Sequence, residues 1–155
     1  MVNASTVADI TCLQHIGITV SDVDETLAFW SALLGVDPLW RRTLDGAYLS
    51  DVTGYPGVVL DAGMIELPGG AMLEVLDYRV AEKQANDMAT ANPGNVHIAI
   101  RVIDIDSVWQ RAIDAGGLAV SPAPVTVTSG PNTGAKACYL RDPNGVTLEL
   151  IQPPN

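Results

Sequence analysis

The two histidines of the chain stand at matching positions in two similar stretches of sequence. His15 lies in "LQHIGITVSDVDETLAFW" and His97 lies in "NVHIAIRVIDIDSVWQRA". Two glutamates repeat in the same way, Glu74 in "LPGGAMLEV" and Glu149 in "DPNGVTLEL". Imidazole nitrogens and carboxylate oxygens together form a common ligand set for divalent first-row metal ions. The four residues are therefore candidate ligands of one metal ion, with one His and one Glu from each half of the chain.

The repetition extends beyond these four residues and indicates a tandem duplication of a half-domain. It predicts an N-terminal extension over residues 1–12, a first module over 13–80 and a second module over 95–155. The polar segment "AEKQANDMATANPG", residues 81–94, is expected to link the modules. At 155 residues the two modules together fit one compact domain.

Each module opens with an alternating strand that is followed by an amphipathic helix. Ile16 and Ile18 alternate with His15 in the first strand, and Val96, Ile98 and Ile100 alternate with His97 in the second. The helices are expected to begin after their capping residues and to end at glycine. These limits are Asp22 and Gly35 in the first module, and Asp104 and Gly116–Gly117 in the second.

Strands return after each helix and close the module. In "GVVLDAGMIELPGGAMLEVLDY" a turn at Pro68–Gly70 joins two strands, and in "AKACYLRDPNGVTLELIQ" the turn is Asp142–Gly145. Residues 46–57 are expected to form a long irregular insert, either a lid or a solvated loop. The order strand, helix, then two or three strands, written twice, predicts an α+β fold.

Alternation also decides which way the candidate ligands point. The aliphatic residues of each strand must bury against the neighbouring helix, so His15 and His97 face the other side of the sheet. Glu74 and Glu149, each flanked by aliphatic residues, face that side as well. A carboxylate on the inner face of a sheet costs several kcal/mol unless it is compensated. A divalent cation held by all four side chains would provide this compensation.

Charge and composition exclude several classes of partner. Eighteen acidic residues against eight basic residues give a net charge of −10, which argues against nucleic acid and against anionic membranes. Cys12 and Cys138 form neither a disulfide framework nor a CxxC motif. The N-terminus "MVNASTVADI" lacks the features of a signal peptide, and no stretch approaches the roughly 18 apolar residues of a membrane span. We expect a cytoplasmic protein that acts on a small molecule.

Four stretches resemble the vicinal oxygen chelate superfamily, which contains glyoxalase I, methylmalonyl-CoA epimerase, extradiol dioxygenases and bleomycin- and fosfomycin-resistance proteins. They are "LQHIGITVSDVDETLAFWSALLG", "MLEVLDY", "NVHIAIRVIDIDSVW" and "CYLRDPNGVTLELIQ", and the resemblance runs from Leu13 to Gln152. It implies two βαβββ modules that form an open, cup-shaped mixed β-sheet, with helices on the outer face and a metal ion in the cup. The family's ligand positions fall on His15, Glu74, His97 and Glu149.

Among these proteins the set His, Glu, His, Glu is most similar to glyoxalase I. The resemblance implies a metal-dependent isomerase, epimerase or lyase that abstracts a proton next to a polarised carbonyl. Glu149 is the expected base and Glu74 the second candidate. The metal is left open among Zn, Ni, Co, Mn and Fe. A metabolite- or drug-binding protein and an Fe(II)-dependent ring-cleaving dioxygenase are the alternatives.

Residues near the ligands give candidates for substrate binding. Arg101 shares the strand face of His97 and is expected to bind an acidic group, while Tyr48 and Tyr55 are expected to line the pocket. Trp40 and Tyr78 are further candidates for the pocket wall, and Arg41–Arg42 forms one of the few basic clusters. Thr19 stands where glyoxalase I has an arginine that helps to bind glutathione, which argues against glutathione as part of the substrate. The resemblance further implies a homodimer, with the site either within one chain or across exchanged modules.

Overall fold

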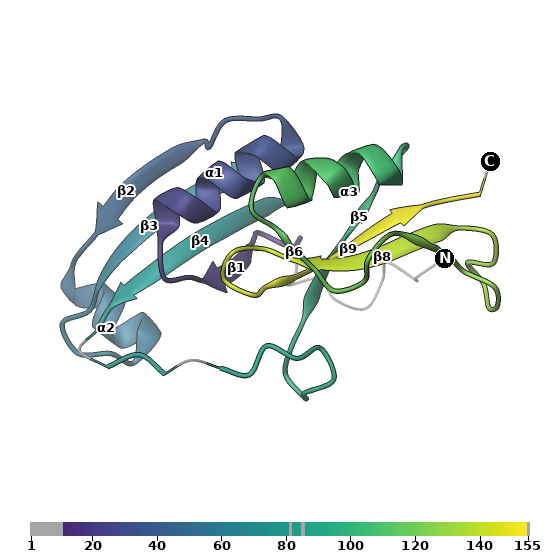
Figure 1. Cartoon of the computed structure of the whole chain (residues 1–155). Coiled ribbons are helices and arrows are strands. Elements are labelled where there is room, and N and C mark those ends of the chain that lie inside the picture. The colour runs from purple at the N-terminus through teal and green to yellow at the C-terminus, as the bar shows by residue number, and fades with distance from the viewer. Residues whose placement is uncertain (1–10, 81, 85, 155) are drawn as a thin grey trace.

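Two β-sheets, one from each module, form the framework of the protein (Figure 1). The computed structural model describes residues 11–80, 82–84 and 86–154, so most of the expected extension over 1–12 lies outside the described residues. The first sheet has the strand order β1-β4-β3-β2, with β1 parallel to β4. The first module consists of β1 (Ile16–Thr19), α1 (Val23–Leu34), β2 (Trp40–Leu44), α2 (Ala47–Thr53), β3 (Val59–Glu66) and β4 (Met72–Arg79).

The second module repeats this plan with shorter outer strands. Its sheet has the order β5-β9-β8-β6, β7 pairs with β8, and β5 is parallel to β9. The predicted α+β fold of two βαβββ modules with open sheets is confirmed, and within one chain each module forms its own sheet. The elements are β5 (His97–Arg101), α3 (Ile105–Asp114), β6 (Leu118–Ala119), β7 (Val125–Thr126), β8 (Lys136–Arg141) and β9 (Thr147–Gln152).

The two long helices begin close to the predicted positions, and each is capped by an aspartate. The Asp22 carboxylate accepts a hydrogen bond from the backbone N–H of Glu25, and Asp104 accepts one from Ser107. Helix α1 ends at Gly35, whose φ of 74° is the left-handed conformation that glycine adopts without steric cost. None of the helices in the described part of the chain is both long and apolar enough to cross a membrane.

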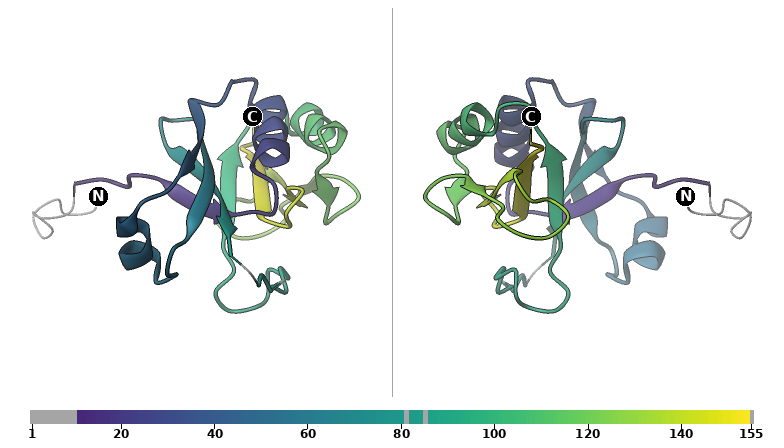
Figure 2. Two further views of the ribbon diagram at one scale, coloured as in Figure 1. Left: turned by 90° about the vertical axis from the view of Figure 1, so that its left-hand side faces the viewer. Right: turned by 90° about the vertical axis from the view of Figure 1, so that its right-hand side faces the viewer.

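A single hydrophobic core joins the two modules. Helices α1 and α3 lie side by side in both views of Figure 2, and their apolar faces pack with the helix-facing residues of both sheets. Trp30 of α1 and Ile105 of α3 are completely buried in this core. One core therefore contains residues of both modules.

Two local expectations are wrong. The segment 46–57 was expected to be irregular, but it contains helix α2, which packs Leu49 against Val58 and Leu60 in a small second apolar cluster. Val96 was expected to share the buried face of Ile98, but it precedes β5 and is 69% exposed. In both cases the packing of neighbouring elements, rather than the local alternation, determines the outcome.

A buried carboxylate ties the start of α1 to the first sheet. Asp61 on β3 accepts hydrogen bonds from Thr43 at 2.7 Å, from Arg79 at 2.7 Å and from Arg41 at 3.1 Å. Arg41 in turn donates to Asp24 of α1 at 2.9 Å. The bond from Thr43, joined by those from Arg79 and Arg41, lowers the pKa of Asp61 from 3.8 to about 2, although burial acts in the opposite direction.

A second set of contacts joins the modules at the turn of the last hairpin. The side-chain oxygen of Asn144 accepts hydrogen bonds from the backbone N–H and the hydroxyl of Ser21, at 2.9 and 3.0 Å. Its amide nitrogen donates to the buried hydroxyl of Thr26 at 2.7 Å. The turn of the second module is thereby fixed to the N-terminal end of α1 in the first.

We expect Asp61→Asn to destabilise the fold by about 1–3 kcal/mol, because hydrogen bonds to a charged group are lost. Since the pKa of Asp61 is lowered in the folded state, its carboxylate stabilises the protein above the unfolded pKa, and this contribution is lost as the pH falls through about 2. The difference in unfolding free energy between the wild type and the variant should therefore shrink below pH 4. Urea titrations at several acidic pH values measure this difference in unfolding free energy. The exposed Asp45→Asn is the control, and a difference that stays constant with pH would contradict the assignment.

We expect Asn144→Ala to cost about 1–3 kcal/mol of stability, because three hydrogen bonds between the modules are lost. Hydrogen exchange should accelerate most in the first turn of α1, which these bonds anchor. Urea unfolding combined with exchange mass spectrometry tests both effects. Asn132→Ala, on an exposed turn, is the matched control. Equal exchange rates in the two variants would show that Asn144 does not hold the modules together.

Candidate metal centre

The first His–Glu pair lies on the first sheet. His15 immediately precedes β1, and Glu74 lies on the adjacent strand β4, opposite Gly17 in the parallel register. The His15 Nε2 atom is 3.2 Å from the Glu74 Oε2 atom. The side chains are 37% and 19% exposed, so both remain accessible from solvent. The pair therefore presents one nitrogen and one oxygen donor at the same point of the sheet surface.

The second pair repeats this arrangement on the other sheet. His97 begins β5, Glu149 lies on the neighbouring strand β9, and their Nε2 and Oε2 atoms are 3.0 Å apart. The side chains of His97 and Glu149 are 43% and 19% exposed, close to the values of the first pair. The His97 ring lies 5.4 Å from the ring of Tyr139, centroid to centroid. Tyr139 was not singled out from the sequence, although the alternation along β8 places it on the face of Glu149.

The packing of the flanking residues explains why the glutamates point outward. Leu73 and Val75 on either side of Glu74 are completely buried in the core, as are Leu148 and Leu150 on either side of Glu149. Successive side chains of a strand point to opposite faces. Each glutamate therefore lies on the sheet face that is turned away from α1 and α3, together with its histidine.

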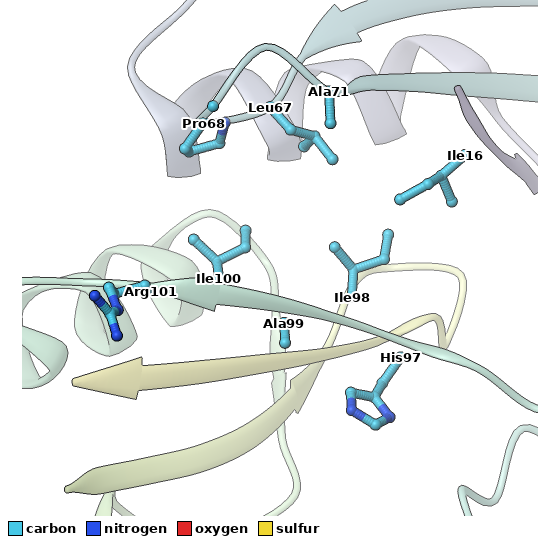
Figure 3. Close-up of a pocket in the computed structure, with 10 residues that line it drawn as sticks. Ile16, Leu67, Pro68, Ala71, His97, Ile98, Ala99, Ile100 and Arg101 are labelled. Atoms are coloured by element: carbon cyan, nitrogen blue, oxygen red, sulfur yellow. The ribbon is translucent and has the colours of Figure 1, made fainter. Parts of the chain in front are cut away.

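The four candidate ligands do not form one cluster within the chain. Among the described residues, no group of three or more His, Cys, Asp and Glu side chains is close enough to hold a metal ion. A cavity of about 440 Å³ separates strand β1 from strand β5. Figure 3 shows Ile98 pointing toward Ile16 and Ile100 pointing toward Leu67 and Pro68, whereas the His97 ring points to the other side of β5. The cavity lies between the sheets and is lined by His97 and Arg101 as well as by apolar residues, whereas neither Glu74 nor Glu149 lines it.

The chemistry of each pair suits a divalent cation, but the number of donors falls short. An imidazole nitrogen and a carboxylate oxygen 3.0–3.2 Å apart can bind the same first-row metal ion. Catalytic sites of this kind have about three protein ligands and an open position. One pair supplies two donors and both pairs together supply four, so the donors fit a metal ion only when the pairs combine.

The candidate substrate-binding residues differ in how they lie relative to the His–Glu pairs. Arg101 is an exposed residue at the end of β5, and it lies on the same strand face as His97. Among the described residues, no carboxylate forms an ion pair with Arg101. Tyr55 packs edge-on against Tyr78, with ring centroids 5.8 Å apart, and Tyr78 shares the β4 face of Glu74. Tyr48 lies on α2 and is 58% exposed, and no contact places it beside either pair.

Comparison with known proteins agrees with this architecture. Two curated relatives are similar over most of their length. A 2-epi-5-epi-valiolone epimerase of Actinomyces is 26% identical over 149 residues, which cover 92% of this chain and 79% of that protein. A probable lactoylglutathione lyase of Synechocystis is 28% identical over 142 residues, which cover 90% of this chain and 94% of that protein.

The fold recurs in a solved structure, and a family-level match covers nearly the whole chain. The crystal structure of a glyoxalase family protein from Bacillus cereus superposes with a TM-score of 0.80 at 21% identity, covering 97% of this chain and 100% of that one. The sequence model of the glyoxalase/bleomycin resistance protein/dioxygenase superfamily matches residues 13–150. The chain therefore belongs to the glyoxalase/bleomycin resistance protein/dioxygenase superfamily.

Proposed function

We propose that the protein is a divalent-metal-dependent isomerase, epimerase or lyase of the glyoxalase I type, acting on a small oxygenated metabolite. The observation that carries this proposal is the recurrence of a His–Glu pair at equivalent positions of both modules, with N···O distances of 3.2 and 3.0 Å. The similarity to one protein named an epimerase and one named a lyase supports the same class of reaction.

The complete site is proposed to form between two copies of the chain. Within one chain, the pairs could meet only if one module moved relative to the other. The shared core and the Asn144 contacts oppose such a movement. Strands β1 and β5 are edge strands of their sheets, and unpaired edges are sites of association between chains. If β1 of one copy lay along β5 of a second copy, the first pair of one chain would face the second pair of the other.

The chemistry follows from the four side chains in such a site. When bound, a divalent cation would polarise a substrate carbonyl and make the adjacent C–H bond more acidic. Glu149 is the proposed general base: its carboxylate removes the carbon-bound proton and returns it to the substrate from the protonated form. Glu74 presents the equivalent carboxylate in the first module, and it is the second candidate for the general base or serves as the general acid. Arg101 would orient an acidic group of the substrate on the side of His97.

A mixing experiment tests the shared site. We expect the double variants His15→Ala/Glu74→Ala and His97→Ala/Glu149→Ala each to lose the divalent metal ion, because each retains only two of the four ligands. In a mixed dimer, one of the two sites would regain all four ligands. Refolding an equal mixture should therefore restore metal binding, measured by mass spectrometry of the intact complex and by elemental analysis.

The matched control refolds each variant alone, and light scattering determines the number of chains. Metal bound by a wild-type monomer, or a mixture that binds no more metal than the separate variants, would contradict a site shared between chains. Wild-type protein without any bound divalent ion after metal loading would reject the proposed function itself and favour a binding protein.

We expect Glu149→Gln to slow proton exchange at the reactive substrate carbon by about 100-fold or more, the usual effect of removing a general base. NMR in D₂O, with hemithioacetals, α-keto thioesters and CoA esters as probe substrates, follows this exchange directly. Circular dichroism and elemental analysis should show that the fold and much of the metal are retained. Glu82→Gln, on the exposed segment between the modules, removes the same charge elsewhere and serves as the control. Normal turnover by Glu149→Gln would disprove the assigned base.

A further inference from the structure

Arg41 and Arg42 are neighbours in sequence, but the structure separates them onto opposite faces of the first sheet. Arg41 pairs with Gly63, where an added Cβ atom would meet Leu27 of α1, so Arg41 lies on the helix-facing side. Its guanidinium is neutralised there by Asp24 and Asp61. Arg42 must therefore point to the face that carries His15 and Glu74.

The strand register places Arg42 in line with the first His–Glu pair. Arg42 lies opposite Ala62 of β3, and Ala62 lies opposite Leu76 of β4, two residues after Glu74. Neighbouring strands are about 4.8 Å apart, so the Arg42 backbone lies about 10 Å across the sheet from β4. Ala62 is completely buried, and Met64, which lies opposite Glu74, is 8% exposed. The β3 residues between Glu74 and Arg42 are thus apolar and carry no charge that would neutralise Arg42.

The guanidinium of Arg42 is held in place but not neutralised. Its Cζ atom lies 4.3 Å from the centroid of the Trp40 ring, a cation–π contact that uses the face of the guanidinium and none of its N–H donors. Within the described part of the chain, Arg41, Arg79, Lys83 and Lys136 each form an ion pair with a carboxylate, whereas Arg42 forms none. Arg101, Arg111 and Arg141 likewise form no ion pair within the described residues, so Arg42 is distinguished by its place on the face of His15 and Glu74.

We propose that Arg42, stacked on Trp40, is a specificity-determining residue that binds an anionic group at the distal end of the substrate. The inference rests on the proposed function, because the other end of the substrate is taken to react at the His15–Glu74 pair. Two strand spacings of about 4.8 Å separate the backbones of β2 and β4, so the geometry selects elongated substrates whose carboxylate or phosphate lies at the end away from the reacting oxygens. A guanidinium binds either anion through paired N–H donors.

Hydroxamates that carry a charged tail test this proposal, because a hydroxamate presents two neighbouring oxygens to a metal ion. The probes are acetohydroxamate, ω-carboxyalkyl hydroxamates of increasing chain length, their methyl esters, and the matching phosphonates. Isothermal titration calorimetry with metal-loaded protein measures each dissociation constant. We expect the best carboxylate to bind about tenfold more tightly than its ester, as one charge-assisted hydrogen-bonded contact would give. The phosphonate series shows which anion is preferred.

The variants separate this inference from the proposed function. Arg42→Met should remove the preference for the charged tail and leave the affinity for acetohydroxamate unchanged, while Arg42→Lys should keep part of the preference. Arg111→Met removes an exposed arginine of α3 and should keep the full preference. Thermal melting checks that all variants fold.

Two results would overturn the inference. If the wild type bound acids and esters equally, or if Arg42→Met kept the preference, Arg42 would have no role in selecting the substrate, and the proposed function would stand. If acetohydroxamate failed to bind to metal-loaded wild type, the proposed function would be rejected, and the role of Arg42 would be rejected with it.

Discussion

The alternation of side chains across two pairs of parallel strands is the constraint on which the candidate site depends. In β4 and β9, aliphatic residues that are completely buried flank Glu74 and Glu149. A shift of either strand by one residue would place a carboxylate in the core and expose two leucine or valine side chains, at a cost of several kcal/mol. The core that stabilises the fold therefore also fixes the outward direction of both glutamates. The same constraint acts on β1 and β5 and orients the two histidines.

Duplication explains why the site has matching halves. Each module alone can place one imidazole beside one carboxylate, because its first and last strands are adjacent and parallel. Two donors hold a divalent cation weakly, whereas four donors of this type form a good site. In the proposed site, four donors would therefore meet only through association, and β1 and β5, beside which the histidines lie, are edge strands along which sheets can associate.

The residue pattern predicts the local structure well and the relations between elements less well. Alternation and capping residues predict both modules, the limits of α1 and the sheet face on which each histidine and glutamate lies. Helix α2 was missed because its stability comes from the packing of Leu49 on another strand. The contacts of Asn144 with Ser21 and Thr26 join residues far apart in the chain, and no local pattern encodes them. The separation of the two His–Glu pairs within one chain likewise depends on how the modules pack.

The arrangement of positive charge follows from the same alternation and bears on the substrate. Arg42 and Arg101 both lie on the sheet faces that carry the His–Glu pairs, and within the described residues neither has an ion-pair partner. Arg41, one residue from Arg42, faces the helices and is paired with two carboxylates. Arg111 and Arg141 also form no ion pair within the described residues, so it is their position that distinguishes Arg42 and Arg101. On these two faces an unpaired arginine suits an anionic substrate, since an internal ion pair would have to be broken before the substrate could bind.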